Sequence, residues 1–300
     1  MNRDTDLFRC GYVAILGAPN AGKSTLLNRM LGQKLSITSK KPQTTRNRIL
    51  GVVHRKGSQV VFLDTPGIHR AKNPLNTRIV DAALSTLAEV DLILLVVDVQ
   101  NPDNASEDLL MGKLETQKHP VVLALNKIDQ LQRPELLVRI ERWSQRFAFT
   151  AVVPVSAKSG EQVDRLLDAM EMALPEGPPF FPPESLTDLP MRFIAAELIR
   201  EKVIRLTGQE IPYAVAVTID LFKEEKNGSL NRIHATIHVE RDSQKGIVIG
   251  KGGAKLKQIG EAARQEIEQL LESKVFLKLF VRVQKNWTKD TKALRKFGYE

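Results

Sequence analysis

Cysteine is nearly absent from this 300-residue chain, which contains only Cys10. A single thiol excludes an internal disulfide framework and a thiolate-rich metal site. Long apolar runs are also missing, because the longest aliphatic stretch covers residues 92–97, whereas a membrane-spanning helix needs roughly 20 residues. The N-terminus has no cleavable apolar segment that would indicate a signal peptide. We therefore expect a cytoplasmic protein.

Positive charge exceeds negative charge, with 44 Lys and Arg against 35 Asp and Glu and a net charge of +9. The excess is concentrated in two places. Residues 274–300 contain eight basic and two acidic side chains, and residues 245–257 contain four lysines and no acid. Such concentration favours a polyanionic partner, which is either a nucleic acid or an anionic membrane surface.

Residues 1–175 alternate short apolar runs with amphipathic stretches. This alternation predicts an α/β domain with a doubly wound, mostly parallel sheet. The expected strands are 12–16, 47–54, 59–63, 91–98, 120–126 and 151–155. The expected helices lie near 22–31, 75–88, 105–118, 134–147 and 160–173. The first pair of neighbouring strands, 47–54 and 59–63, is predicted to form a hairpin, so one edge strand should be antiparallel.

Six prolines between positions 175 and 190 interrupt the pattern and predict a semi-rigid linker over residues 176–190. Residues 191–300 are predicted to form a second, smaller α+β domain. Its expected elements are helices at 191–206 and 254–272, strands at 213–223, 230–240 and 275–284, and a short helix at 288–296.

A glycine-rich loop follows the first strand and opens the first helix, and it fits the pattern G-x-x-x-x-G-K-[ST] of a P-loop. Its backbone N–H groups and the helix N-terminus suit a triphosphate. Lys23 is expected on the β- and γ-phosphates, and the Ser24 hydroxyl on Mg²⁺. The residues expected to bind nucleotide here are Gly17, Ala18, Pro19, Asn20, Ala21, Gly22, Lys23, Ser24 and Thr25.

A second motif, Asp64-Thr65-Pro66-Gly67, ends the strand 59–63. The carboxylate of Asp64 can hold Mg²⁺ through water at this strand end, and the N–H of Gly67 can bond a γ-phosphate oxygen. Both groups are expected beside the P-loop.

Two further motifs end later strands and predict the choice of base: Asn126-Lys127-Ile128-Asp129 and Ser156-Ala157-Lys158. The carboxylate of Asp129 can accept from the N1–H and exocyclic amine of guanine, neither of which adenine offers. The Lys127 stem can lie along the base, Asn126 can tie this loop to the P-loop, and the Ala157 N–H can donate to guanine O6. The four motifs, each at a strand's carboxyl end, predict a guanine-nucleotide site.

With these motifs, the first half resembles translation-factor-related GTPases and thus the P-loop NTPase fold. The resemblance implies a threonine that caps Mg²⁺ when GTP is bound, and both Thr44 and Thr45 qualify, with Thr45 slightly favoured. It also implies GTP hydrolysis, in which we expect Lys23, Thr45 and Gly67 to take part. Ile68 stands where Ras-like enzymes carry a water-orienting glutamine, so slow intrinsic hydrolysis is expected.

The second half contains G-x-x-G at residues 250–253, between an apolar segment and an amphipathic helix. This pattern resembles the loop of a type II KH domain, which clamps about four nucleotides of single-stranded RNA. Lysines around the loop add charge, and three basic residues at every fourth position share one face of the last predicted strand. The expected RNA-binding residues are Ile249, Gly250, Lys251, Gly252, Gly253, Lys255, Lys257, Lys274, Lys278 and Arg282.

A GTPase domain, a proline-rich linker and one C-terminal KH domain together resemble the bacterial Era family. The resemblance implies a monomer that binds the 3′-terminal region of 16S rRNA, takes part in assembly of the 30S subunit and touches the inner membrane peripherally. Two alternatives stay open on the residues alone. One is an RNA-binding protein whose nucleotide domain does not catalyse, and the other is a GTPase whose basic C-terminus targets a membrane.

Overall fold

The computed structural model describes residues 8–38, 48–64, 67, 89–208, 211, 215–225 and 229–297. They form two compact units that divide between Asp188 and Leu189, and Ile37 and Thr38 group with the second unit. The division falls inside the predicted linker, and the boundaries proposed at either end of that linker stay predictions.

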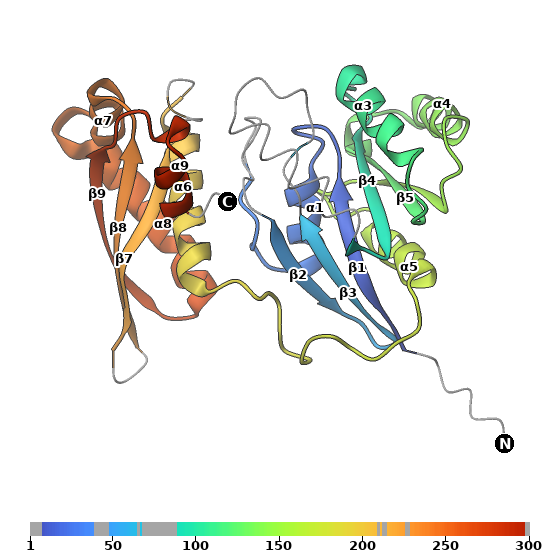
Figure 1. Ribbon diagram of the computed structural model, residues 1–300, viewed down its shortest axis with the longest axis horizontal. Coiled ribbons are helices and arrows are strands. Elements are labelled where there is room, and N and C mark those ends of the chain that lie inside the picture. Colours follow the sequence, from blue (N-terminus) through green and yellow to red (C-terminus); the bar gives the residue numbers. More distant parts are fainter. Residues whose placement is uncertain are drawn as a thin grey trace. The chain divides into compact units, whose positions relative to one another are not determined.

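The first unit is built on a six-stranded sheet with the order β2-β3-β1-β4-β5-β6 (Figure 1). Its strands are β1 (Arg9–Leu16), β2 (Ile49–His54), β3 (Ser58–Asp64), β4 (Leu92–Asp98), β5 (Val121–Asn126) and β6 (Ala151–Val155). All neighbours are parallel except the β2–β3 hairpin, which is antiparallel. The predicted α/β fold with one antiparallel edge strand is therefore confirmed.

Helices cover both faces of this sheet, which explains why β3, β4 and β5 are buried along their whole length. They are α1 (Lys23–Leu31), α3 (Asn104–Leu114), α4 (Arg133–Ser144) and α5 (Val163–Ala173). Side chains of α3 and α4 join one apolar core, and α1 packs with α5. The helix expected near 75–88 lies outside the described residues.

The order β3-β1-β4 places a topological switch point at β1, because the chain winds outward from it in both directions. In open α/β sheets, ligands bind beside such a point at the carboxyl ends of the strands. The P-loop follows β1 and therefore begins at this position.

The proline-rich segment lies along the first unit and is held to it by hydrogen bonds. The Gln59 side chain accepts from the N–H groups of Phe180 and Phe181 at 2.7 and 2.9 Å. The Phe180 ring stacks on Tyr12, with 5.2 Å between ring centroids. Further along, the Leu186 carbonyl accepts from the Val52 N–H at 2.9 Å. The predicted linker is thus docked over much of its length.

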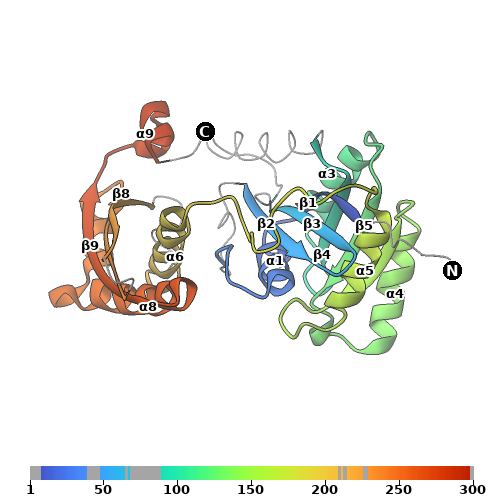
Figure 2. The ribbon, with the colours of Figure 1, turned by 90° about the horizontal axis from the view of Figure 1, so that it is seen from below.

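The second unit is a three-stranded sheet, β7-β8-β9, with α6 and α8 packed against it (Figure 2). β7 and β8 are antiparallel, and β8 and β9 are parallel. The elements are α6 (Met191–Leu206), β7 (Ala216–Glu224), β8 (Leu230–Val239), α7 (Asp242–Ile249), η3 (Lys251–Gly253), α8 (Ala254–Leu271), β9 (Lys274–Val283), η4 (Trp287–Lys289) and α9 (Thr291–Lys296).

The sequence pattern does not predict α7, and the structure corrects this. Its run Ile247-Val248-Ile249 favours a strand by its β-branched side chains, and Gly246 weakens a helix. Tertiary packing outweighs these propensities, because Val248 is fully buried and α7 packs against α8. Within the described ranges, no helix is both long and apolar enough to span a bilayer.

Candidate nucleotide site and nucleic-acid groove

The P-loop joins the end of β1 to the start of α1 through three residues with positive φ. Gly17, Asn20 and Gly22 have φ values of 156°, 64° and 100°. The last of these is the N-cap of α1, where its carbonyl accepts from the Leu26 N–H at 2.8 Å. The loop thus ends on the positive pole of a helix, which is a ready anion site.

Lys23 is buried at the first position of α1, with 7% of its surface exposed. Its Nζ donates to the carbonyl oxygens of Gly17 and Ala18 at 3.0 and 2.9 Å. Burial lowers the pKa of Lys23 to about 8, against the opposing effect of Asp64. The ammonium is therefore poorly solvated and suited to an anionic partner.

Asp64 ends β3 and is completely buried. Its Oδ2 accepts from the Ser24 and Ser36 hydroxyls, both at 2.9 Å. Its Oδ1 has no hydrogen-bond partner among the described residues. Burial raises the pKa of Asp64, while Lys23 and the two hydroxyls oppose the rise. An unpaired buried carboxylate oxygen beside a serine hydroxyl suits a hard divalent cation.

Gly67 lies against the P-loop. A Cβ built on it would be 3.0 Å from the Pro19 Cα and 3.3 Å from the Lys23 Nζ. Gly67 therefore lies beside Lys23, and its contact with a terminal phosphate stays a prediction. Thr65, Pro66 and Ile68, like Thr44 and Thr45, lie outside the described residues.

Asn126 joins the P-loop to the two loops expected to bind the base. Its Nδ2 donates to the Ala21 carbonyl at 2.8 Å. Its Oδ1 accepts from the N–H groups of Lys127 and Ala157, at 2.8 and 3.0 Å. The predicted tie between these loops is therefore present in the geometry. The sequence predicts that the Ala157 N–H donates to guanine O6. In this structure it donates to the Asn126 Oδ1 instead.

Asp129 and Lys127 are each held by a residue from a neighbouring loop. The Asp129 Oδ1 accepts from the Ser156 hydroxyl at 2.7 Å, while the residue itself is exposed. Lys127 adopts a φ of 72° and forms an ion pair with Asp98 at the end of β4. Lys158 and Thr25 are exposed. Lys158 follows Ala157, which donates to Asn126, and Thr25 follows Ser24, which donates to Asp64.

Alanine at Gly22 is expected to weaken nucleotide binding by about 100-fold. Its Cβ would lie 2.2 Å from the Asn126 Nδ2, and the φ of 100° disfavours any side chain. Calorimetric titration with GDP measures the effect. Gly112→Ala is the matched control, because this helical glycine has nothing within 4 Å of a built Cβ. The control should bind normally and gain about 0.5–1 kcal/mol of stability, whereas unaltered GDP binding by Gly22→Ala would contradict the prediction.

The G-x-x-G loop of the second unit joins α7 to α8. Gly250, Gly252 and Gly253 have φ values of 71°, 60° and 81°. A Cβ on Gly250 would lie 2.6 Å from the Lys255 Cβ, whereas the other two glycines face open space. The exposed Lys251 lies between Gly250 and Gly252. Such a loop lets a bulky anion approach the backbone closely.

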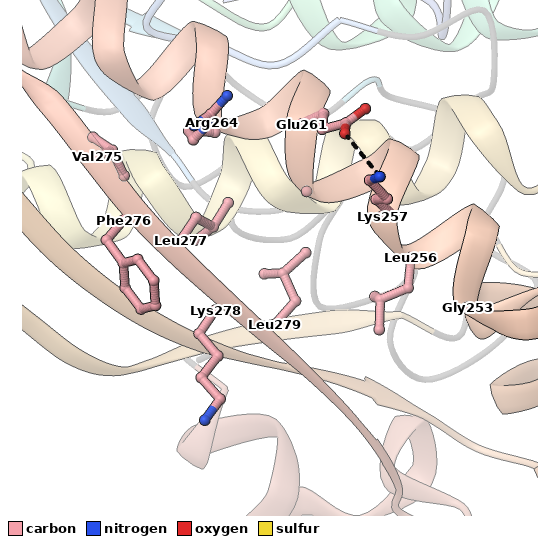
Figure 3. Close-up of a pocket in the computed structure, with 11 residues that line it drawn as sticks. Gly253, Leu256, Lys257, Glu261, Arg264, Val275, Phe276, Leu277, Lys278 and Leu279 are labelled. Atoms are coloured by element: carbon pink, nitrogen blue, oxygen red, sulfur yellow. Dashed lines mark ion pairs between the residues drawn. The ribbon is translucent and has the colours of Figure 1, made fainter.

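A groove of about 580 Å³ follows this loop, between α8 and the edge strand β9 (Figure 3). Its apolar wall includes Leu256, Leu277 and Leu279, and its rim carries Lys257, Glu261 and Arg264. Lys257 forms an ion pair with Glu261, which the dashed line in Figure 3 marks, with 4.0 Å between Nζ and Oε1. The volume falls in the range of ligand sites, and the wall suits the flat faces of bases.

The predicted RNA-binding residues fall into two groups. Gly253 and Lys257 line the groove, Ile249 ends α7, and Lys255 is half-buried, with its Nζ 3.3 Å from the Gln258 Oε1. Lys274, Lys278 and Arg282 alternate along β9 with the side chains that face α8. Figure 3 shows Lys278 pointing away from the groove. Lys274 and Arg282 are therefore not among the residues that line the groove, and Lys278 lines it with a side chain that points away.

Sequence reasoning missed two residues of the nucleotide site, Ser36 and Asp98. Ser36 reaches Asp64 from a loop without a motif, so nothing in its surroundings marks it. Asp98 could have been found, because it ends β4 opposite Asn126 in the parallel register.

Each of the two units matches a known protein family. Residues 12–127 match the family described as 50S ribosome-binding GTPase, and residues 210–288 match the KH domain family. Among the curated relatives, GTPase Era of Geobacter metallireducens is 54% identical over 292 residues, covering 97% of this chain and 98% of that protein. GTPase Era of Staphylococcus haemolyticus is 47% identical over 291 residues, covering 97% of each chain.

Two solved structures agree over nearly the whole length. One is a variant of Aquifex aeolicus Era bound to GDP·AlF4⁻, and the other is Era in complex with MgGDPNP and nucleotides 1506–1542 of 16S ribosomal RNA. Each is 40% identical with a TM-score of 0.92, covering 97% of this chain and 99% of that chain. With both domains matched in this order, and with 54% identity across 97% of its residues, the chain belongs to the Era family of GTPases.

Proposed function

We propose that this protein binds and hydrolyses GTP in its first unit and binds the 3′-terminal region of 16S rRNA in its second, as a monomeric cytoplasmic switch in assembly of the 30S subunit. One observation carries the nucleotide part of the proposal. Asn126 ties the loop that contains Asp129 directly to the P-loop, so a base and its phosphates would be held by one connected framework.

The phosphate end of the site supports triphosphate binding. The N-terminus of α1 and the buried ammonium of Lys23 supply positive potential, and burial of the ammonium reduces its screening by water. Because the site is preorganised, the same groups can stabilise charge that develops on the phosphates during hydrolysis. Gly67 lies beside Lys23, where the sequence predicts that its N–H meets a γ-phosphate oxygen.

Mg²⁺ fits the residues present. Ser24 and Asp64 would hold it, the first through its hydroxyl and the second through the buried Oδ1 that has no described partner. The ion would neutralise phosphate charge when bound. Among the described residues, no group of three or more His, Cys, Asp or Glu side chains is placed to hold a metal ion. Thr44 and Thr45 remain predicted caps for it.

The RNA part of the proposal depends on the groove beside the G-x-x-G loop. Its open glycines admit a phosphate backbone, and its apolar wall admits bases. The complex of Era with nucleotides 1506–1542 of 16S rRNA supports the choice of RNA. The proposed switch also requires that the affinity for RNA differs between the GTP-bound and the GDP-bound protein.

Two carboxylates in the loop test the RNA part. Lys251→Asp combined with Gly252→Asp places negative charge where phosphates approach, so affinity for RNA of nucleotides 1506–1542 should fall by about 100-fold or more. Fluorescence anisotropy measures it with GDP and with a non-hydrolysable GTP analogue. For the unaltered protein the two nucleotides should give different affinities, and equal affinities would contradict the switch.

The matched control is Lys113→Glu combined with Glu115→Lys, which leaves the net charge unchanged on exposed residues at the end of α3 in the first unit. GTP hydrolysis should be unaltered in both variants, because neither alters a residue of the nucleotide site. Full RNA affinity in the loop variant would exclude the groove as the binding site.

A further inference from the structure

The second unit has two sheet faces, and only one of them is covered by α6 and α8. The other, which we call the open sheet face, consists of alternate residues of the three strands. It is formed by Leu221, Lys223, Arg232, His234, Thr236, His238, Lys274, Phe276, Lys278, Phe280 and Arg282. At one end it is covered, because the Phe297 ring lies 4.6 Å from the ring of His238.

Two aromatic rings stand exposed on this face. Phe276 and Phe280 are 47% and 45% exposed, although they belong to a well-formed strand. They are four residues apart, which corresponds to about 13 Å along a strand. Figure 3 shows Phe276 on the side of β9 away from α8. Large exposed rings at regular spacing indicate a binding surface rather than a core.

Cationic groups lie beside each ring. The guanidinium of Arg232 is 5.5 Å from the Phe276 ring centre, and the Lys278 Nζ is 5.1 Å from that of Phe280. Lys274 and Arg282 extend the basic row at either end of β9. Two acids lie nearby: Glu225 pairs with Arg232, and Asp220 accepts from Thr236. Against these two carboxylates the face carries five Lys and Arg side chains, at positions 223, 232, 274, 278 and 282, so it offers net positive charge to an incoming partner.

Rings alternating with cations suit a single-stranded polynucleotide, whose bases stack on aromatics while its phosphates meet the charges. A stacked strand rises about 3.4 Å per nucleotide, so rings about 13 Å apart would hold bases that are not neighbours. A folded protein or a membrane would favour contiguous apolar surface, which this face lacks because a charged residue separates the rings.

The edge strand β9 connects this face to the groove. Residues 275–279 all line the groove, but alternation along the strand places Leu277 and Leu279 on the face that α8 covers and Phe276, Lys278 and Phe280 on the opposite face. We propose that the open sheet face is a second single-stranded RNA surface, on which Phe276 and Phe280 stack bases of an RNA that continues around β9 from the groove. This inference rests on the proposed RNA binding in the groove.

The test uses the full-length protein and two probes: RNA of nucleotides 1506–1542, and a piece of about four nucleotides that fills only the groove. Phe276→Ala with Phe280→Ala should weaken binding of the long RNA by about tenfold for each ring. Binding of the short piece and GTP hydrolysis should stay unaltered. Equal weakening of both probes would mean that the rings act structurally, which would overturn the proposal.

Conservative variants identify the partner. Phe276→Leu with Phe280→Leu keeps apolar area without an aromatic face and should lose as much affinity as alanine, whereas the tryptophan pair should restore it. Full binding by the leucine pair would overturn stacking. Loss of binding to vesicles of phosphatidylglycerol and phosphatidylcholine, with RNA binding unaltered, would instead assign the face to a membrane.

Charge variants give an independent readout. Lys278→Gln with Arg282→Gln should lower the slope of log affinity against log salt concentration by about 0.7 for each phosphate that the protein no longer neutralises. The alanine pair at the two rings should leave this slope unaltered. If the groove is not an RNA-binding site, the loop variant Lys251→Asp with Gly252→Asp will bind the four-nucleotide piece as well as the unaltered protein does. That result is distinct from every outcome expected if only the sheet-face proposal is wrong.

Discussion

Asparagine at position 129 is expected to lower affinity for GTP by about 1,000-fold or more and to make xanthosine triphosphate the better ligand. A carboxylate at Asp129 accepts from two guanine donors, and sites of this kind reject analogues that lack the donors by roughly 10⁴–10⁵. Xanthine carries an oxygen where guanine carries its amine, so an amide at 129 can donate to it. The Ser156 hydroxyl, at 2.7 Å, can still donate to the amide oxygen and hold it in place.

Competition of the two triphosphates against a fluorescent guanine nucleotide measures the change. A gain of xanthosine triphosphate binding cannot come from misfolding, which makes the exchange of ligands diagnostic. Asp108→Asn is the matched control, since it removes an exposed carboxylate of the same unit that pairs with Arg146 on the surface. If the Asp129 variant keeps its preference for GTP, another group recognises the base.

Glutamine at position 23 should lower affinity for GTP by about 100-fold. Lys23 is buried, and removal of one partner of a desolvated charge pair costs about 2–5 kcal/mol. Stability without nucleotide should be equal or higher, because burial lowers the pKa of Lys23 to about 8 and the folded state carries a poorly solvated charge below that pH. A fall in the melting temperature would mean that Lys23 has a structural role instead.

The same pKa predicts how binding depends on pH. Phosphates beside Nζ favour the protonated amine, so the pKa of Lys23 should rise above about 8 when GTP binds. Affinity attributable to this group is then complete below pH 8 and weakens as pH rises further, by up to about tenfold per pH unit. Calorimetry at about pH 7 and about pH 9 checks this. The Lys23→Gln variant has no amine to titrate at this position, so any pH dependence of its GTP affinity comes from the base. If the variant and the unaltered protein show the same pH dependence, the assignment of that dependence to Lys23 is contradicted.

The fold of the first unit could be predicted closely from its sequence because its central strands are apolar on both faces and four of its six strands end at a motif. The runs before Gly17, Asp64 and Asn126 are β1, β3 and β5, with bounds that differ by a few residues at most. Parallel strands buried on both sides leave little ambiguity, and the motifs fix where they end. The site follows, since strand ends of one sheet meet at one edge.

Other features depend on tertiary contacts that no local pattern carries. The hydroxyl of Ser36 on Asp64 joins residues 28 positions apart, and α7 forms against the propensity of its own side chains. On β9, alternation correctly placed Lys274, Lys278 and Arg282 on one face. It did not separate that face from the groove, because the pattern alone does not say which face α8 covers.

The side chain of Asn126 has a consequence for the energetics of the whole nucleotide site. Both its oxygen and its nitrogen are engaged by protein groups on three separate loops, and the nitrogen occupies the space that a side chain at Gly22 would fill. Protein hydrogen bonds therefore link the three loops to one another, so a molecule that meets them in this arrangement loses little ordering entropy on binding. A site whose loops are linked in this way would select nucleotides by their shape when they first bind. Any conformational change on binding would then occur in segments outside these three loops.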